Sequence, residues 1–434
     1  MKDISFKQIN SEELLKKMEE PDVIIIDIRS PDAYNGWIER NEVREGHIRG
    51  AKSLPFKWSK YIDWIEIVRS KKISPEHTLV IYGYDKNNIE IVAKLFIKSG
   101  YPYVFVYYSF IDEWSADEKY PIEKMERYTQ LVSPEWLKSL MDNHTAPNYH
   151  NKRFVVCHAH YQNRKDYEEG HIPGAIDVNT NLLESPETWN RRSPEELKNV
   201  LENLGITHDT TVILYGRFSY PDNDDPFPGS SAGHLGAMRC AFIMMYAGVE
   251  DVRLLNGGIQ SWIDEGYEIS TEEFIKEPVK DFGTVVPSNP HFAVDLQEAK
   301  DILKDKNKNL VCVRSRDEYI GKVSGYNYIE KKGRIPGAVF ADCGSDAYNM
   351  ENYRNLDHTT REYHEIEDQW AKEGITREKF NAFYCGTGWR GSEAFFNAWL
   401  LGLSEIAVYD GGWFEWSNNN LPYETGLPEG GFNE

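Results

Sequence analysis

The feature that most limits how this chain can fold is a sequence pattern that recurs three times, at a period of about 130 to 150 residues. Each copy opens with an apolar run, a turn and an amphipathic segment: DVIIIDIRSPDAYNGW (22–37), RFVVCHAHYQNRKDYEEG (153–170) and NLVCVRSRDEYIGK (309–322). A short glycine turn follows in each copy: GHIRGA (46–51), GHIPGA (170–175) and GRIPGA (333–338). The chain therefore repeats one folding unit.

The second half of each copy repeats as well. After a helical stretch comes a second apolar run: TLVIYG (78–83), TVILYG (211–216) and FNAFYC (380–385). A further helix, a third apolar run and an aromatic turn complete the copy: YPYVFVYYSFIDEW (101–114), VEDVRLLNGGIQSWIDEGY (249–267) and LSEIAVYDGGWFEWSNNNLPY (403–423). Apolar runs that alternate with helical periodicity indicate a mostly parallel sheet with helices on both faces.

We therefore predict an α/β protein of three domains, with boundaries at 1–127, 128–272 and 285–430. The charged, proline-containing segment 270–290 reads as the linker between the second and third domains. Residues 115–135 form a less distinct linker between the first and second domains. A length of 434 residues fits this count, because single domains rarely exceed about 250 residues.

Charge and composition exclude several classes of partner. The chain carries 70 acidic and 49 basic side chains, for a formal net charge of -21. Such a field repels nucleic-acid phosphates and anionic membranes, so neither is expected as a partner. Five scattered cysteines, no membrane-length apolar run and a polar N-terminus without a signal pattern predict a cytoplasmic protein without a disulfide framework.

The candidate reactive group is Cys385, at the end of the second apolar run of the third copy. Ligands of open parallel sheets lie beyond the carboxyl ends of the strands, where this cysteine is expected. The segment Gly386, Thr387, Gly388, Trp389 and Arg390 then leads into a helix. A glycine-rich loop presents backbone N–H groups, and a helix N-terminus adds a positive dipole end. Both stabilise a thiolate or a persulfide, so we predict that this loop binds a negatively charged sulfur.

The other two copies have no thiol at this position. Gly83 stands there in the first copy, and Gly216 in the second, which also has an inserted loop before its helix. Neither copy can form a persulfide there. We expect one active site, with the first two domains acting as scaffold, interface or binding domains.

The remaining candidate groups have ordinary explanations. Cys312 and Cys240 lie in apolar segments and are expected in the core, whereas Cys343 is a candidate resolving thiol near the sheet edge. In residues 157–160, Cys-His-Ala-His, strand alternation separates the cysteine from the two histidines, which disfavours a metal site. The acidic turn 221–226 lacks the glycine and distal glutamate of a calcium loop. We predict neither a metal nor a cofactor.

Several of these motifs, taken in order, resemble the rhodanese (sulfurtransferase) family: the D-x-R-S strand end, the GHIPGA turn, the loop cysteine and the final DGG-x-x-x-W. The resemblance covers nearly the whole chain. The second and third copies are similar to tandem thiosulfate/3-mercaptopyruvate sulfurtransferases, in which only the C-terminal domain is catalytic. The resemblance implies ping-pong transfer of a sulfane sulfur through a Cys385 persulfide to a thiophilic acceptor, cyanide or a thiol.

Rhodanese-fold phosphatases are an alternative, but their loops place five residues between cysteine and arginine. Four residues separate Cys385 from Arg390 here, a spacing that favours a single sulfur atom over a phosphate. A second alternative is a sulfur-relay or interaction module that receives persulfide and passes it to a protein thiol. The acidic surface and the two thiol-less domains suit such a docking role.

The choice of sulfur donor stays open between thiosulfate and 3-mercaptopyruvate. The family's substrate-contacting arginine, four positions after the D-x-R arginine, is matched here by Glu318. Val313 is taken as the residue at the aspartate of that motif, and Arg334 replaces the histidine of GHIPGA. Arg314, Arg316 and Arg334 remain candidate substrate contacts beside Arg390.

Overall fold

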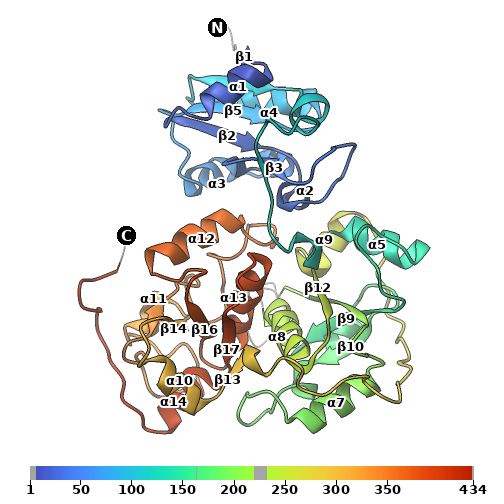
Figure 1. The fold of residues 1–434 in the computed structure, drawn as a ribbon, viewed down its shortest axis with the longest axis vertical. Coiled ribbons are helices and arrows are strands. Elements are labelled where there is room, and N and C mark those ends of the chain that lie inside the picture. The colour runs from blue at the N-terminus through green and yellow to red at the C-terminus, as the bar shows by residue number, and fades with distance from the viewer. Residues whose placement is uncertain (1–5, 163, 219–231, 433–434) are drawn as a thin grey trace. The chain divides into compact units, whose positions relative to one another are not determined.

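The computed structural model describes residues 6–162, 164–218 and 232–432, and these ranges divide into two compact units at Thr129 and Gln130. The first unit contains the first sequence repeat, and the second contains the other two (Figure 1). The acidic turn 221–226, considered above as a calcium loop, lies outside the described residues. No helix in the described part of the chain is long and apolar enough to cross a bilayer.

Three parallel five-stranded sheets carry the fold. The first, in spatial order, contains β1 (Lys7–Gln8), β6 (Val104–Tyr107), β5 (Thr78–Tyr82), β2 (Val23–Asp27) and β4 (Lys52–Ser53). The second contains β8 (Leu131–Val132), β12 (Asp251–Leu255), β11 (Thr211–Gly216), β9 (Phe154–His160) and β10 (Ile176–Asn179). The third contains β13 (Ala293–Val294), β17 (Ile406–Tyr409), β16 (Phe380–Tyr384), β14 (Lys308–Cys312) and β15 (Val339–Phe340). All three share one strand order, which confirms the predicted α/β class and the threefold repeat.

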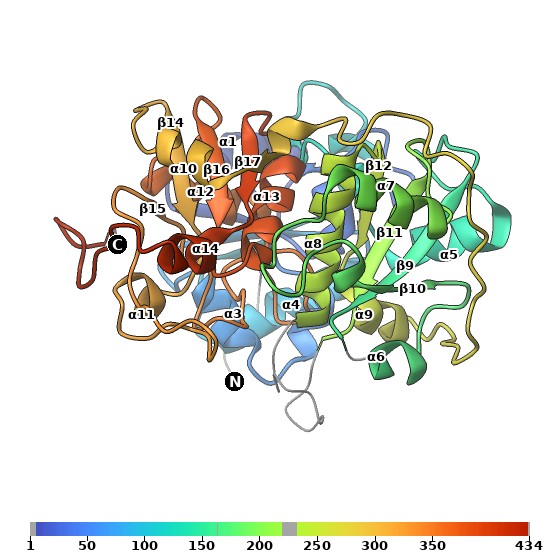
Figure 2. The same cartoon turned by 90° about the horizontal axis from the view of Figure 1, so that it is seen from below.

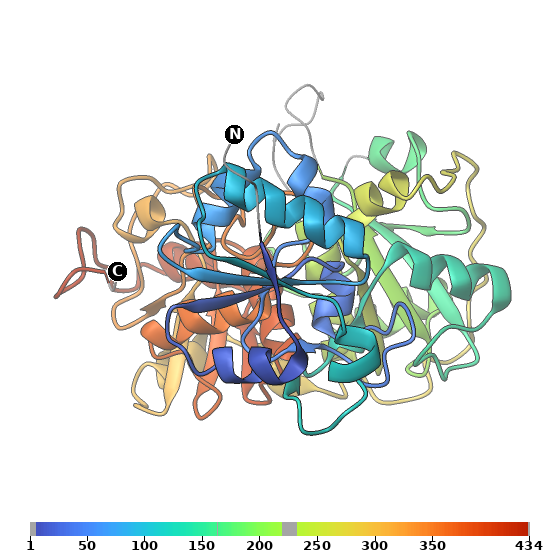
Figure 3. The ribbon, with the colours of Figure 1, turned by 90° about the horizontal axis from the view of Figure 1, so that it is seen from above.

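Helices cover both faces of the first sheet. Its helices are α1 (Ser11–Lys17), α2 (Pro31–Asn35), α3 (Trp64–Ser70) and α4 (Lys86–Lys98), and a small antiparallel pair joins β3 (His47–Ile48) to β7 (Ile122–Glu123). Figure 3 shows α1, in dark blue, on one side of this sheet and α4 on the other. Leu14 of α1 packs with Val80 on one face, and Phe96 of α4 packs with Leu79 on the other.

The second unit contains ten helices among the described residues. They are α5 (Pro134–Asn143), α6 (Lys165–Glu168), α7 (Pro194–Asn203), α8 (Ala232–Ala247), α9 (Gly258–Asp264), α10 (Leu296–Ile302), α11 (Arg316–Tyr319), α12 (Tyr363–Lys372), α13 (Trp389–Leu400) and α14 (Gly412–Asn418). Figures 1 and 2 show α8 and α13 side by side between the two sheets. Their contact includes the edge-to-face pair Phe242 and Phe395, whose ring centroids are 5.3 Å apart. The second and third repeats therefore share one packed interior.

The segment predicted as a linker between these two repeats lies along the second one. Ser270 forms a backbone bridge with His171, and the Val279 N–H donates to the Glu202 carbonyl. Phe282 is buried, and its N–H donates to the Glu202 carboxylate. Within this unit, segment 270–282 is thus part of the packed surface of the second repeat. The exact domain boundaries stay a prediction.

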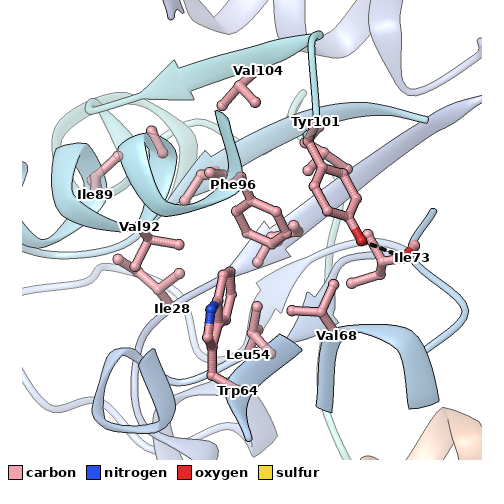
Figure 4. Packing of buried hydrophobic residues seen from close by; sticks show 14 of the residues in the cluster. Ile28, Leu54, Trp64, Val68, Ile73, Ile89, Val92, Phe96, Tyr101 and Val104 are labelled. Carbon is pink, nitrogen blue, oxygen red and sulfur yellow. Dashed lines mark hydrogen bonds between the residues drawn. The ribbon is translucent and has the colours of Figure 1, made fainter. Parts of the chain in front are cut away.

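The core of the first unit provides a test of the packing. Phe96 is fully buried between Trp64 and Tyr101, with ring centroids 4.9 and 5.0 Å away (Figure 4). We expect Phe96→Ala to lower the free energy of unfolding of this unit by about 3–5 kcal/mol, because it removes a large side chain and leaves a cavity. Ile91→Ala, on the same helix but 45% exposed, should change it by no more than about 0.5 kcal/mol.

Hydrogen–deuterium exchange of peptides from residues 78–107 is the appropriate measurement, because it reports on the first unit alone. Equal effects of the two substitutions would contradict the packing shown in Figure 4.

Candidate active site

Cys385 follows β16 directly, at the carboxyl edge of the third sheet, and is fully buried. The Trp413 N–H donates to the Cys385 carbonyl at 2.8 Å, and the Phe414 N–H donates to the Gly386 carbonyl at 2.9 Å. These bonds fasten the loop to the first turn of α14, which begins in the DGG motif. The backbone of the loop that carries the thiol is therefore held in place by α14.

Two positions in this loop require glycine. A Cβ at Gly386 would lie 2.2 Å from the Tyr326 ring. Gly388 has φ +87°, and a Cβ there would lie 3.0 Å from both Arg239 and Asp410. A side chain at either position would displace these neighbours, and at Gly388 it would also strain the backbone.

Helix α13 starts immediately after the loop, with Gly388 as its N-cap and no side chain capping the first turn. The N-terminal N–H groups of a helix carry a partial positive charge, which favours an anion nearby. The loop thus combines a thiol with the positive end of a helix of 12 residues. This arrangement suits a thiolate or persulfide.

Arg390 forms a buried ion pair with Glu318. Its Nη1 and Nη2 donate to the two Glu318 carboxylate oxygens at 2.9 and 2.8 Å. Nη2 also donates to the Tyr326 hydroxyl at 2.7 Å, and Nη1 lies 3.2 Å from the Cys343 sulfur. Burial favours a neutral Glu318, but Arg390 outweighs burial, so the pKa of Glu318 lies below its usual value.

Cys343, the candidate resolving thiol, is part of this network. It is fully buried, and burial raises the pKa of its thiol well above the usual value despite the nearby Arg390. A thiol with a raised pKa stays protonated at neutral pH and is a poor nucleophile. Its role as a resolving thiol stays a prediction.

The three arginines predicted as candidate substrate contacts all have other partners. Arg314 Nε donates to the Cys312 sulfur at 3.2 Å, and its Nη2 donates to the Gly333 carbonyl at 2.6 Å. Arg316 lies over the Phe432 ring at 4.2 Å. Arg334 pairs with Glu424 at 3.1 Å and lies over the Tyr319 ring at 5.0 Å. Their assignment to a substrate therefore stays a prediction without a contact that supports it.

The placement of Val313 at the motif's aspartate position is wrong. In the first repeat, Asp27 accepts from Arg29 Nε at 3.0 Å and from the Tyr82 hydroxyl. The strand register pairs Asp27 with Tyr82 and, in the third repeat, Cys312 with Tyr384. Cys312 is thus the residue that replaces the aspartate, two positions before its arginine.

Two tyrosines from the segment after α11 form one wall around Cys385. The Tyr326 ring packs on Gly386, and the centroids of the Tyr326 and Tyr328 rings are 5.2 Å apart. Burial and, secondarily, the proximity of Cys385 raise the pKa of Tyr328; a hydrogen bond with the Thr387 side chain opposes this rise. Burial likewise raises the pKa of Tyr326, although Arg390 works against it. Both hydroxyls therefore stay protonated at neutral pH.

Two aromatic residues of the second repeat pack against rings of the third repeat. Trp189 stacks on Tyr328 with ring centroids 5.5 Å apart, and Tyr161 meets the Trp389 ring edge-on at 5.3 Å. The Trp389 indole N–H donates to the two carboxylate oxygens of Glu184 at 3.0 and 3.1 Å. Aromatic rings from two repeats therefore pack together beside the loop that holds the thiol.

Further buried charges near the loop are paired. Arg239 Nε donates to Glu184 at 2.8 Å, and Arg191 Nη1 donates to the Asp410 carboxylate at 2.8 Å. Together with the pair of Arg390 and Glu318, these contacts leave three arginines matched by three carboxylates. These pairs offset the charge of three arginines near the thiol, whereas the buried Arg314 donates to the Cys312 sulfur and the Gly333 carbonyl.

In the first and second repeats, neighbouring atoms occupy the space that a side chain would need at the position of Cys385. A Cβ at Gly216 would lie 2.0 Å from the Gly233 carbonyl oxygen, and one at Gly83 would lie 2.7 Å from Ile28. A cysteine therefore could not replace either glycine without displacing its neighbours.

Some site residues were missed in the sequence because they come from other segments. Glu318 did carry a signal: Ser315 and Glu318 have S-x-x-E spacing, and they form the capping box of α11. Tyr326 and Tyr328 alternate in the segment SGYNYIE, but nothing local places them against Cys385. Glu184 and Trp189 lie in another repeat, so only the packing of α8 on α13 reveals them.

Comparison with known proteins places the chain in a family. The model of the rhodanese-like domain matches residues 10–117, 133–265 and 295–419. Thiosulfate sulfurtransferase YnjE of Escherichia coli (strain K12) is 36% identical over 408 residues, which cover 92% of this chain and 88% of the relative.

Solved structures are more similar still. An anaerobic ergothioneine biosynthesis enzyme from Chlorobium limicola, solved in complex with its natural substrate trimethyl histidine, is 59% identical with a TM-score of 0.95. The alignment covers 98% of this chain and 100% of that one. A tyrosine variant of EanB with a cysteine persulfide, in a tetrahedral intermediate state with ergothioneine, has the same identity and TM-score, over 97% of this chain and 100% of that one. Matched along almost its whole length, this chain belongs to the rhodanese family and is built from three rhodanese-like domains.

Proposed function

We propose that this chain is a sulfurtransferase that carries a sulfane sulfur as a persulfide on Cys385 and transfers it to the imidazole ring of trimethyl histidine, forming ergothioneine. The observation that carries the proposal is the aromatic, charge-paired surroundings of Cys385. The 59% identity to an ergothioneine biosynthesis enzyme supports it.

Cys385 is the proposed carrier because its loop combines a buried thiol with the uncapped N-terminus of α13. The thiolate attacks the outer sulfur of a donor, the donor's remaining anion leaves, and Cys385 holds the persulfide. Backbone N–H groups at the start of α13 stabilise the negative sulfur during loading and discharge.

The acceptor follows from the aromatic rings. Trimethyl histidine carries a permanent quaternary ammonium group, and aromatic faces bind such cations. Tyr326, Tyr328 and Trp389 line the loop, and Trp189 and Tyr161 extend the aromatic surface. An anionic donor such as thiosulfate would find Arg390 already paired with Glu318.

Transfer breaks the sulfur–sulfur bond and forms a carbon–sulfur bond. The imidazole carbon between the two ring nitrogens gives up its proton and attacks the outer persulfide sulfur, and Cys385 leaves as a thiolate. The protons balance because the thione product carries one more N–H, on the ring nitrogen that was bare in the acceptor. The outer sulfur is reduced as it becomes the thione sulfur, and the carbon is oxidised to the same extent, so no further oxidant is needed.

Tyr326 is the proposed proton donor for this step. Its hydroxyl oxygen accepts from Arg390 Nη2, so its own hydrogen can point to an acceptor nitrogen in the pocket. Its raised pKa keeps the proton on the phenol at neutral pH. A hydrogen bond to a ring nitrogen stabilises the charge that develops as the ring carbon reacts.

A second candidate function is transfer from thiosulfate or 3-mercaptopyruvate to cyanide or a thiol. The Escherichia coli relative is named a thiosulfate sulfurtransferase, and the first half-reaction, loading of Cys385, is the same. The two functions differ only in the acceptor. Parallel assays with both acceptors therefore distinguish them.

We expect the wild-type protein to gain the mass of one sulfur atom when it is incubated with a sulfane-sulfur donor, and Cys385→Ser to gain none. Intact mass spectrometry after thiosulfate, 3-mercaptopyruvate or inorganic polysulfide ranks the donors. Cys240→Ser is the matched control, because Cys240 is fully buried in α8 and should leave the uptake unchanged. Sulfur uptake by Cys385→Ser would refute the assignment.

We expect discharge of the loaded protein to discriminate between trimethyl histidine and histidine. Loss of the three methyl groups should raise KM about tenfold, because the primary ammonium of histidine is more strongly hydrated than a trimethylammonium group and loses more on contact with aromatic faces. Steady-state formation of the thione, followed by mass spectrometry of the product, measures this. Fast discharge by cyanide with none by trimethyl histidine would favour the second candidate function.

Tyr326→Phe should lower kcat for ergothioneine formation by about 100-fold or more, because it removes the proposed proton donor. Loading of Cys385 should stay unchanged. Tyr319→Phe is the control, since it also loses a buried hydroxyl, which donates to the Ala338 carbonyl in the same domain. A comparable fall in kcat for both variants would show that Tyr326 acts only through packing.

A further inference from the structure

The second domain touches the Cys385 loop through a buried carboxylate. Glu184 follows a short 3-10 turn (Thr180–Leu182), and its N–H donates to the Thr180 carbonyl at 3.0 Å. Its side chain is fully buried and accepts from two sources: Arg239 Nε, and the indole N–H of Trp389 in the third domain. The carboxylate therefore joins the core of one domain to the thiol loop of the next.

An ion pair of opposite polarity occupies the corresponding place in the third domain. Arg239 of α8 and Glu393 of α13 stand at the same distance before the glycines that end their helices, Gly248 and Gly402. Glu393 pairs with Arg354, whose Nε donates to its carboxylate at 2.8 Å. The second domain thus has a loop glutamate and a helix arginine, and the third has a loop arginine and a helix glutamate.

The two loop residues face different partners across the domain contact. Arg354 lies over the ring of Phe218, 5.3 Å away, just after β11 of the thiol-less second domain. Glu184 instead faces Trp389, just after the Cys385 loop. Of these two loop residues, Glu184 is therefore the one that contacts the segment next to Cys385.

The second domain holds Trp389 from three directions. Both Glu184 oxygens accept from the indole N–H, and Tyr161 meets the ring edge-on. The third contact is Gly236 of α8, where an added Cβ would lie 3.6 Å from the indole ring. An indole has one N–H, so a carboxylate that accepts it restrains the position and direction of that edge of the ring.

We infer that Glu184 is a positioning residue of the active site: acting through Trp389, it fixes the aromatic wall against which the trimethylammonium group of the acceptor binds. This inference rests on the proposed function. It also gives the thiol-less second domain a role in catalysis, as the supplier of one wall of the pocket. Rigid support of a binding group by neighbouring hydrogen bonds is what keeps such a site in productive geometry.

The test is a double-variant cycle with Glu184→Gln and Trp389→Phe. Glutamine keeps the shape of the side chain, but its amide N–H groups then meet the donors of Arg239 or Trp389. We expect Glu184→Gln to raise KM for trimethyl histidine about tenfold, the effect of losing a hydrogen bond to a charged group, and to change kcat less than about threefold. Sulfur loading of Cys385 should be unchanged.

If Glu184 acts through Trp389, the double variant should have the same KM as Trp389→Phe alone. Glu393→Gln is the matched control, because it makes the same substitution in the ion pair of opposite polarity. It should lower the melting temperature to a similar extent and leave KM unchanged. Additive KM effects in the double variant, or an equal rise in KM for Glu393→Gln, would overturn the inference.

A direct readout does not depend on the acceptor. The indole ¹H–¹⁵N signal of Trp389, assigned from its loss in Trp389→Phe, should shift and exchange faster with solvent in Glu184→Gln. An unchanged signal overturns the positioning role. If wild-type protein fails to convert trimethyl histidine, the proposed function fails, and the indole signal still decides whether Glu184 positions Trp389.

Discussion

The buried ion pair between Arg390 and Glu318 organises the surroundings of the thiol. Glu318 accepts a hydrogen bond from the Ser315 N–H at the start of its own helix, and it accepts from both Nη1 and Nη2 of Arg390. Arg390 Nη2 also donates to the Tyr326 hydroxyl. Removal of one partner of such a pair leaves an uncompensated buried charge, at a cost of about 3–5 kcal/mol. The helix cap, the first turn of α13 and the tyrosine wall therefore depend on one another.

The same pair decides what charge the pocket presents. An unpaired arginine five positions after the cysteine would attract an anion. Here Arg390 is neutralised by Glu318, and Arg239 by Glu184. The aromatic rings then dominate the recognition, and their negative faces favour a cation.

The three domains show how one frame accommodates different chemistry. His171 stacks on Tyr167 in the second domain, and Arg334 lies over Tyr319 at the corresponding turn of the third. Each of these tyrosines donates to a backbone carbonyl of the turn. Arg334 therefore has a structural explanation that does not involve substrate, because it occupies the place of the histidine.

The sequence alone determined the threefold repeat, the parallel sheets and the position of Cys385 at a strand end, because these follow from local apolar periodicity and glycine turns. The capping box of Ser315 and Glu318 was also readable, since it depends on residues three apart. The residues that contact the Cys385 loop could not be predicted from local sequence patterns. Trp389, Glu184 and Tyr326 are brought together only when α8 packs on α13 and when the segment after α11 folds over Gly386. Tertiary structure therefore decided that Arg390 is paired and that aromatic rings gather beside Cys385, because both depend on contacts between residues far apart in the chain.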